Sequence, residues 1–594
     1  MSSSGPTRIL LVGWGTAEWA LLSPLLDSGQ LPNLGRLIRQ GALGRPVTPH
    51  PSLPLPIWTS IATGVHPDRH GLLSPAPLHT RREPAIWDRL AAHGLRCHVI
   101  GWPGAVQAED IPGLFVTPDF GAKPRPHSVS PTHLADALAE LHLPARDFPP
   151  AALQELLPLA HTIDQRYDDR LGRIAKALAI ACSLHNVATH ALAEHPWDFA
   201  AVHYDALAYC SVHFAEFLPP RMAHISPALH EIYGGLLPAV YRFHDMLLGA
   251  LLDIAGPDTA VVFVAPFGYA SAADRPPKNS TSFTDRQSWV TRSGLLCLRA
   301  PSLPADELLY GARLVDVAPT VLGLLGLSAE DLDGRALSGA ANPAALSPES
   351  LGLATQFLAM VASDAQSPAD EQEQFQLSGV YMSTGRPQLA LPLLETLAAE
   401  APEEIRYQRT LAQCWIVLGR IEEAETLLNA LIDGQEPHAW AYFLRGVIYS
   451  HRRQSALALA DLEKASSLGE SSPSLHAFIG NIYLAKRLPA KAEAAYGTAL
   501  RLDPASPDAL GGLAALHNLR REPERAADLA LQAIAHRYET PAAHLQLGIA
   551  LARLGQWPRA AVAFRATLAL APGVKSAARY LDVVNARLLP HQRA

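Results

Sequence analysis

The C-terminal part of the chain repeats itself every 34 residues, and this period limits its fold more than any other feature does. Alanines recur at this spacing without a gap, at Ala390, Ala424, Ala458, Ala492, Ala526 and Ala560. A small residue lies twelve positions before each alanine, at Ser378, Ala412, Gly446, Gly480, Ala514 and Gly548. An aromatic residue follows three positions later in four repeats, at Tyr381, Trp415, Tyr449 and Tyr483. Such self-similarity predicts a solenoid whose units bury their apolar faces against their neighbours.

The pattern resembles the tetratricopeptide repeat, in which two antiparallel helices form each unit. Small residues at the two positions let the paired helices approach closely, and the aromatic residue fills the groove between neighbours. Pro402, Pro504 and Pro572 close three of the units. We therefore predict that residues 371–594 form an all-α region of six repeats, over about 371–574, followed by a capping helix over 575–589.

Repeat arrays of this kind bind proteins on a concave face. The resemblance implies that the second, fifth, ninth and twelfth positions of each repeat's first helix line that face. At these offsets the candidate partner-binding residues are Arg406, Arg409, Gln413, Trp440, Asn481 and Asn518. Polar side chains at such positions are as often plain solvated surface, and the array does not identify a particular protein partner.

The first 340 residues have a different pattern, in which short apolar runs alternate with helical stretches. This alternation predicts an α/β sandwich with a largely parallel sheet. The expected strands are residues 9–12, 97–101, 199–203, 260–264 and 295–298. Residues 125–195 are rich in Ala, Leu and charge at helical spacing, which indicates an inserted helical cap. Residues 341–370 are small, polar and proline-containing, which indicates a linker.

Several segments of the α/β region carry a family resemblance. They include RILLVGWGTAEW (8–19), HPSLPLPIWTSIATGVHPDRHG (50–71), WDFAAVHYDALAYCSVHF (197–214) and LLYGARLVDVAPTVLGLLGLSAEDLDGRAL (308–337). These segments resemble the alkaline-phosphatase superfamily, in its branch of type I phosphodiesterases and nucleotide pyrophosphatases. The resemblance implies a serine or threonine nucleophile and two metal ions that clamp the oxygens of an in-line phosphoryl transfer.

At every family position for the nucleophile or a metal ligand, this chain carries a residue without a donor side chain. The nucleophile position lies ten residues before the glycine of the ATG motif and falls on Pro54. The six ligand positions fall on Gly15, Ala208, Val212, Pro266, Phe267 and Val290. A catalytic zinc ion needs about three nitrogen, sulfur or carboxylate ligands from the protein. The resemblance, with these replacements, predicts an inactive domain that holds no metal and no other cofactor.

A rebuilt metal site is the alternative for the same domain. The possible ligands in the matched segments are His50, His70, His203, Asp205 and His213. Their spacing makes no two convergent ligand sets. Active relatives also carry the residues at positions 50, 70 and 205, beside the site, so we expect ordinary polar roles here. A GxSxG elbow or a Cys/His signature for another nucleophile is missing from the sequence.

Composition excludes several classes of function. The net charge of −8 argues against a basic surface that would bind nucleic acid. The five scattered cysteines form neither a disulfide framework nor a zinc pattern. The sequence has no run of 18 apolar residues that could span a membrane and no signal-peptide pattern, so we expect a cytoplasmic protein.

Three functions remain open from the sequence. We favour a pseudoenzyme scaffold or regulatory subunit, which binds protein partners through the repeats and the inactive domain. The second is a ligand sensor that holds an apolar or peptide ligand in the vestigial cleft. The third is a metal-dependent phosphohydrolase with a rebuilt site. The sequence does not indicate an oligomeric state.

Overall fold

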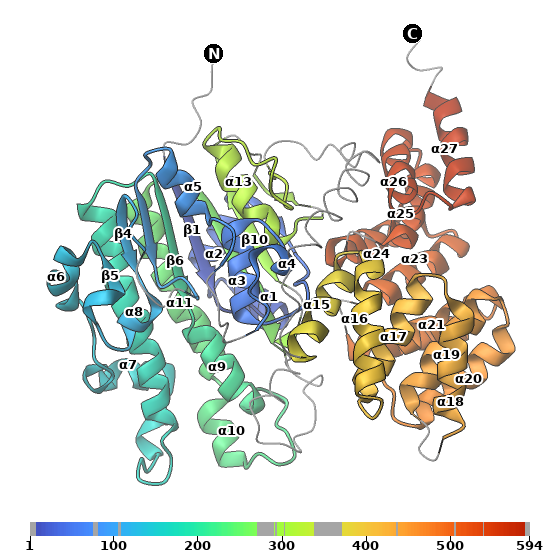
Figure 1. The fold of residues 1–594 in the computed structure, drawn as a ribbon, viewed down its shortest axis with the longest axis horizontal. Helices are drawn as coiled ribbons and strands as arrows, with labels where there is room; N and C mark the ends of the chain where they lie inside the picture. Colours follow the sequence, from blue (N-terminus) through green and yellow to red (C-terminus); the bar gives the residue numbers. More distant parts are fainter. Residues whose placement is uncertain are drawn as a thin grey trace. The chain divides into compact units, whose positions relative to one another are not determined.

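The computed structural model describes residues 8–74, 81–104, 109–269, 290–291, 294–301, 303, 305–309, 311–337, 371–434, 438–503, 506–537 and 540–588. The chain divides into two compact units, Met1–Ala340 and Ala341–Ala594. Figure 1 shows a sheet with helices in the first unit and helices in the second. The predicted order of an α/β region followed by an all-α repeat region is confirmed. The predicted linker, 341–370, lies outside the described residues.

Nine of the described strands form the central sheet of the first unit, in the order β11-β2-β10-β7-β1-β6-β3-β4-β5. The central strand β1 (Ile9–Trp14) pairs in parallel with β6 (Phe199–Tyr204) and with β7 (Ala260–Ala265). Every residue of these three strands is buried, as expected for parallel strands covered on both faces. The other six strands are β2 (Ala42–Gly44), β3 (Cys97–Ile100), β4 (Gly113–Val116), β5 (Val129–Ser130), β10 (Leu295–Arg299) and β11 (Glu307–Leu308).

All five strands predicted from apolar runs are present, as β1, β3, β6, β7 and β10. The sequence did not predict β2, β4, β5 or β11, none of which is longer than four residues. It also missed a separate antiparallel ribbon of β8 (Gly268–Tyr269) and β9 (Val290–Thr291). Runs this short contain too few residues to show a period.

Helices cover both faces of the sheet, because successive residues of each strand point to opposite sides. Leu10 and Val12 of β1 pack against α1 (Trp19–Asp27), α2 (Pro32–Gln40), α8 (Arg170–Glu194), α9 (Ala206–Phe214) and α11 (Leu236–Ala255). Ile9 and Leu11 pack against α3 (Pro54–Thr63), α5 (Ile86–Ala92) and α13 (Val317–Leu324). The smaller helices of this unit are α4 (Pro67–His70), α6 (Ala135–Ala139), α7 (Pro150–Leu156) and α10 (Pro227–Tyr233).

The prediction of a helical cap over 125–195 is wrong for the long helix α8. Ile174 and Leu178 of α8 are fully buried in the same core as Leu10 and Val12 of the central strand. The helix therefore covers the sheet. Its apolar face was visible in the sequence, but the surface that this face would cover was not.

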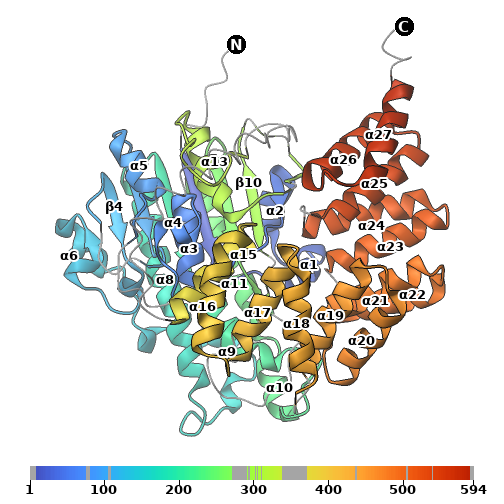
Figure 2. The ribbon, with the colours of Figure 1, turned by 45° about the vertical axis from the view of Figure 1, so that its right-hand side comes forward.

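The second unit consists, over its described residues, of six helix pairs and a final helix. Figure 2 shows the pairs following one another in chain order. Their bounds are α15 (Glu371–Ser383) and α16 (Pro387–Glu400), α17 (Ile405–Val417) and α18 (Ile421–Ile432), α19 (Ala439–His451) and α20 (Ser455–Ser467), α21 (Pro473–Ala485) and α22 (Pro489–Leu502), α23 (Pro507–Leu519) and α24 (Pro523–His536), α25 (Pro541–Arg553) and α26 (Trp557–Leu570), and then α27 (Lys575–Leu588). Six helix pairs and a final helix therefore lie over the residues predicted to form six repeats and a capping helix.

The residues that carry the period are small because the paired helices touch at them. All six of the periodic alanines on the second helices are fully buried. A Cβ added to Gly480 would lie 2.5 Å from the Tyr496 ring, and one added to Gly548 would lie 2.5 Å from the Phe564 ring. A larger residue at either position would push the helix pair apart.

All five cysteines are free thiols. Among the described helices, none combines the length and the apolar character that crossing a membrane requires.

Candidate functional site

The positions that the resemblance predicts for the family's nucleophile and metal ligands lie around the carboxyl ends of the central strands. They are Gly15 after β1, Pro54 at the start of α3, Ala208 and Val212 on α9 after β6, Pro266 and Phe267 after β7, and Val290 in β9. Because β1, β6 and β7 are parallel neighbours, their ends meet at one edge of the sheet. Ligands of open α/β sheets bind at this edge.

Gly15 and Ala208 are so close that no side chain fits between them. A Cβ added to Gly15 would lie 2.7 Å from the Ala208 Cβ and 2.7 Å from Asp205 Oδ1. Carbon atoms in contact prefer separations of about 3.5–4.0 Å. The Gly15 N–H donates a hydrogen bond to the Tyr204 carbonyl oxygen at 2.9 Å, which fixes the end of β1 against the end of β6. An aspartate at position 15 would require the start of α9 to move.

The backbone carbonyl groups just after β7 accept hydrogen bonds from the segments that follow β1 and β2. The Phe267 carbonyl oxygen accepts hydrogen bonds from Thr16 Oγ1 at 2.9 Å and from the Ala17 N–H at 2.7 Å. The Thr48 hydroxyl donates to the Pro266 carbonyl oxygen. The Phe267 side chain is buried in the core that α3 and α13 share. These two ligand positions therefore contribute apolar packing.

The start of α3, where the nucleophile position is predicted, has few backbone N–H donors. Pro54 is exposed at the first position of the helix, where proline is favoured by its fixed φ. Pro54 and Pro56 are two of the first three residues of α3, and neither carries a backbone N–H. A helix N-terminus binds anions through such N–H groups. The N-terminus of α3 is therefore poorly suited to binding a phosphate group.

Two of the possible replacement ligands are neutral histidines in the core. The Leu72 N–H donates to His70 Nδ1 at 3.2 Å, so His70 Nε2 donates to Ser60 Oγ at 3.0 Å. His203 packs edge-on to the Trp58 ring, with ring centres 4.4 Å apart. Burial lowers the pKa of each of these imidazoles, His70 and His203, to about 3. His70 has the ordinary polar role expected of it, and both imidazoles are uncharged near neutral pH.

The remaining possible ligands are dispersed. His50 is half-buried before α3, and the His213 ring on α9 lies 4.4 Å from the Tyr209 ring. Asp205 is exposed at the N-terminus of α9. Among the residues that the structure describes, no group of three or more His, Cys, Asp or Glu side chains could hold a metal ion.

Glu18 is a half-buried charged group at this edge that the sequence analysis missed. Its carboxylate accepts hydrogen bonds from the Tyr269 N–H at 2.9 Å and from Thr291 Oγ1 at 3.1 Å. Burial raises the pKa of Glu18, against the opposing effects of these hydrogen bonds and of the Arg45 charge. Burial also lowers the pKa of Arg45 to about 10. Glu18 thereby joins the turn after β1 to both strands of the β8–β9 ribbon. An acidic residue just past a buried strand end was the signal available in the sequence.

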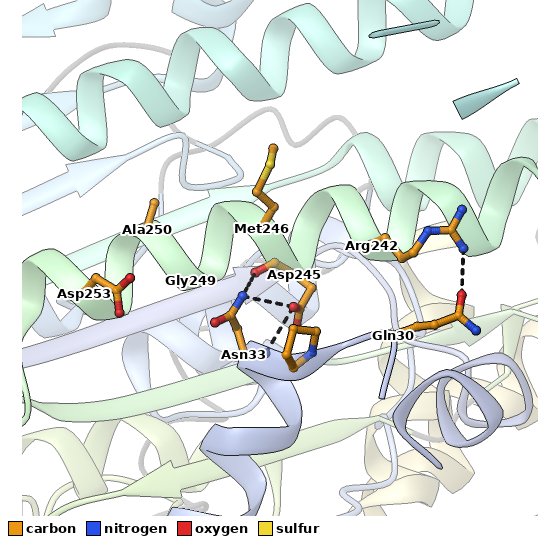
Figure 3. Close-up of a pocket in the computed structure, with 9 residues that line it drawn as sticks. Gln30, Asn33, Arg242, Asp245, Met246, Gly249, Ala250 and Asp253 are labelled. Atoms are coloured by element: carbon orange, nitrogen blue, oxygen red, sulfur yellow. Dashed lines mark hydrogen bonds between the residues drawn. The ribbon is translucent and has the colours of Figure 1, made fainter. Parts of the chain in front are cut away.

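A groove of about 450 Å³ lies away from this edge, between α11 and the start of α2 (Figure 3). Asp245 accepts hydrogen bonds there from the Leu34 N–H at 2.7 Å and the Asn33 N–H at 3.1 Å, so it caps α2. Arg242 Nη1 donates to Gln30 Oε1 at 3.0 Å. These polar groups satisfy one another across a helix-packing seam, and no residue predicted from the sequence as a site residue lines the groove.

Four of the six predicted partner-binding residues lie at least partly at the surface of the repeats. Arg406 and Arg409 are exposed on α17, and Gln413 of the same helix is half-buried. Arg406 Nε lies 3.0 Å from Glu404 Oε2, and its guanidinium lies over the Phe375 ring. Asn481 on α21 is exposed and accepts a hydrogen bond from the Tyr496 hydroxyl at 2.7 Å.

The structure corrects the other two. Trp440 is 8% exposed and packs in the core between α17, α18 and α19. Asn518 is 3% exposed, and its Nδ2 donates to the Gln546 carbonyl oxygen at 2.9 Å, bridging α23 to α25. Both residues hold neighbouring repeats together and are not available to a partner. A fixed offset along the first helix does not show how far that helix is turned toward its neighbour.

Comparison with known proteins identifies both units. The family model described as type I phosphodiesterase / nucleotide pyrophosphatase matches residues 9–306. Tetratricopeptide repeat models match residues 381–443, 479–535 and 520–575. The human protein O-mannosyl-transferase TMTC1 is 30% identical over 132 residues, which are 22% of this chain and 15% of that protein. This chain therefore corresponds to a small part of that relative.

The solved structures that are similar to part of the chain include the following two. The APC/C hetero-tetramer Cut9-Hcn1 matches with 14% identity and a TM-score of 0.33, over 40% of this chain and 46% of that one. YrrB, described as a TPR protein with an unusual peptide-binding site, matches with 16% identity and a TM-score of 0.24, over 31% of this chain and 96% of that one. The phosphodiesterase model covers about half of the residues. The chain therefore belongs to the type I phosphodiesterase/nucleotide pyrophosphatase family of the alkaline-phosphatase superfamily and carries tetratricopeptide repeats after that domain.

Proposed function

We propose that this chain is a catalytically inactive member of its family that works as an interaction scaffold or regulatory subunit. The observation that carries the proposal is the contact of Gly15 with the start of α9. Position 15, the first predicted ligand position, carries no carboxylate. It also has no room for one, because Ala208 and Asp205 occupy the space that a side chain there would need. A site in this condition cannot regain a metal ligand at position 15 without rearranging the end of β1.

Three further features support loss of the phosphoryl-transfer chemistry. The nucleophile position is a proline without a hydroxyl, at a helix start where two of the first three residues also lack a backbone N–H. The ligand positions after β7 are buried apolar residues, Pro266 and Phe267. The half-buried Glu18 carboxylate at this edge accepts hydrogen bonds from within the protein on both of its oxygens.

The repeat region supplies the positive part of the proposal. Its six helix pairs form an array of the kind that binds other proteins, and Arg406, Arg409, Gln413 and Asn481 lie at least partly at its surface. In this account the phosphodiesterase-like unit adds a second protein surface. Proteins of one fold often carry unrelated functions, so the retained fold does not require a retained reaction.

Hydrolysis of phosphodiesters tests the catalytic part of this proposal. The full chain, purified with zinc and manganese supplied, is incubated with bis-p-nitrophenyl phosphate and with a nucleotide diester, beside an active member of the family. We expect no release of p-nitrophenol above the protein-free rate. Hydrolysis that co-purifies with the chain and is abolished by a chelator would contradict the proposal and favour a rebuilt site.

A further inference from the structure

The turn between the two helices of each repeat contains one residue in the left-handed backbone region. These residues recur every 34 positions, with φ values of 74° at Gly385, 77° at Gly419, 61° at Arg453, 57° at Arg487, 62° at Arg521 and 74° at Gly555. Glycine adopts this conformation without strain, whereas a residue with a Cβ does not. Three consecutive repeats therefore carry a strained arginine where the flanking repeats carry glycine.

The three arginines contribute little to the fold that would explain the strain. Arg453, Arg487 and Arg521 are exposed. Within the part of the chain that the structure describes, they form no ion pair. Strain held at an exposed position without a packing role points to function.

The basic residue before each arginine has a different role. Arg452 Nη1 lies 2.7 Å from Glu425 Oε2, and Arg520 Nη2 lies 2.6 Å from Glu493 Oε2. Each of these pairs joins a first helix to the second helix of the preceding repeat. In these two repeats the first of the two consecutive arginines therefore links neighbouring repeats through an ion pair. The second arginine is exposed to solvent.

The chain segments that contain these turns are basic, although the whole chain has a net charge of −8. Residues 451–456, 485–491 and 519–525 contain two glutamates and eight basic residues, at 452, 453, 486, 487, 491, 520, 521 and 525. Leucines lie among them, with Leu488 40% exposed and Leu519 68% exposed. We call the surface formed by Arg453, Arg487, Arg521, Leu488 and Leu519 the turn edge.

We propose that the turn edge binds an extended acidic segment of a partner protein. Packed helices lie about 8–10 Å apart, and an extended chain advances about 3.3 Å per residue. A carboxylate at every third residue would therefore meet one arginine in each repeat. Exposed leucines between the arginines suit apolar side chains of a protein segment and not the phosphates of a nucleic acid or a lipid. The inference rests on the proposed function in that the repeats bind protein.

The test uses the full chain and a fluorescein-labelled peptide of four Glu-Leu-Ser triplets, measured by fluorescence anisotropy. The variant R453G/R487G/R521G removes three charges and also relieves the backbone strain, so lost folding cannot explain lost binding. We expect its Kd to rise at least about 10-fold, from the loss of three charge contacts of modest strength each. R453K/R487K/R521K, which keeps the charges, should remain within about threefold of the wild type on the same grounds. Binding by the wild type should weaken as salt is added.

The matched control is K464Q/R565Q/K575Q, which removes three exposed positive charges elsewhere on the repeats and should leave the Kd unchanged. The proposal is overturned if the peptide does not bind, or if the glycine variant binds as tightly as the wild type. Tighter binding of a single-stranded oligonucleotide or of phosphatidylserine vesicles than of the peptide also overturns it. If R406A/R409A weakens binding of the peptide and the glycine variant does not, the repeats bind protein at another surface. The proposed function then stands, and the proposal for the turn edge is wrong.

Discussion

Ala208 fills the space beside Gly15, so that a Cβ at position 15 would lie 2.7 Å from the Ala208 Cβ. The contact joins the end of the central strand β1 to helix α9, two elements on which the resemblance predicts metal-ligand positions. In this chain the same positions form a packing contact.

Gly15→Ala should destabilise the first unit, because the added methyl group overpacks a closed contact. We expect a loss of about 1–3 kcal/mol in the free energy of unfolding, measured by urea denaturation. Ala208→Gly removes the opposing methyl group, at a cost of about 0.5–1 kcal/mol in a helix. The double variant should lose less than the sum of the two single variants. Simple additivity would show that the two residues do not compete for the same space.

Gly480 and Gly497 form a matched pair in neighbouring helices of one repeat. A Cβ on Gly480 would lie 2.5 Å from the Tyr496 ring, whereas a Cβ on Gly497 would meet nothing within 4 Å. Gly480→Ala should therefore destabilise the repeat unit by about 1–2 kcal/mol through overpacking. Gly497→Ala should stabilise it by about 0.8–1.0 kcal/mol through helix propensity. Thermal unfolding followed by circular dichroism checks both, and shifts of the same sign would refute the assigned geometry.

Arg487→Gly should stabilise the repeat unit although it removes a side chain. Relief of the left-handed conformation is worth about 1–2 kcal/mol, and the greater freedom of glycine in the unfolded chain subtracts about 0.5–1 kcal/mol. The neighbouring Lys486 has an ordinary negative φ of −77°, so Lys486→Gly is the control and should only destabilise. A fall in the midpoint of denaturation for Arg487→Gly would mean that the side chain makes a stabilising contact.

The stability of the first unit should fall as the pH drops from about 6.5, the ordinary histidine pKa, toward 3. Burial lowers the pKa of His70 and of His203 to about 3. The unfolded chain therefore binds protons in this range that the folded chain does not, and each such histidine steepens the loss by up to about 1.4 kcal/mol per pH unit.

His203→Leu should flatten this dependence, because it removes a group that the unfolded chain protonates and the folded chain does not. The substitution breaks no hydrogen bond at His203 Nε2, which has no partner among the described residues. His133→Gln, at an exposed position, is the control and should leave the slope as it is. Urea midpoints measured at intervals between pH 3 and pH 7 give both slopes. Equal slopes for His203→Leu and the wild type would show that His203 is not the buried neutral group described.

Much of the architecture was predictable because its signals are local or periodic. The strands found from apolar runs, such as residues 9–12, are fully buried strands at the centre of the sheet. The period of 34 located the six helix pairs because residues such as Ala390 and Ala424 mark contacts that recur in every unit. The matched family motifs assigned Gly15 and Ala208 to one site, and the structure brings the two residues into contact although they are far apart in the sequence.

The errors concern which surface a residue faces. The role of α8 as a layer on the sheet depends on a partner surface that comes from distant segments. Trp440 and Asn518 lie at positions that often face a partner, but here they join neighbouring repeats. Glu18 escaped notice because its partners, Tyr269 and Thr291, follow it by about 250 residues or more.

The most direct test of the central claim is the amount of bound metal per folded chain. The protein is purified in buffer supplied with zinc and manganese, desalted, and measured by inductively coupled plasma mass spectrometry. Our account predicts well under one ion per chain, because the ligand positions at Gly15, Ala208 and Phe267 offer no donor side chain. One or two tightly held ions per chain would contradict it and would show that the domain has a rebuilt metal site.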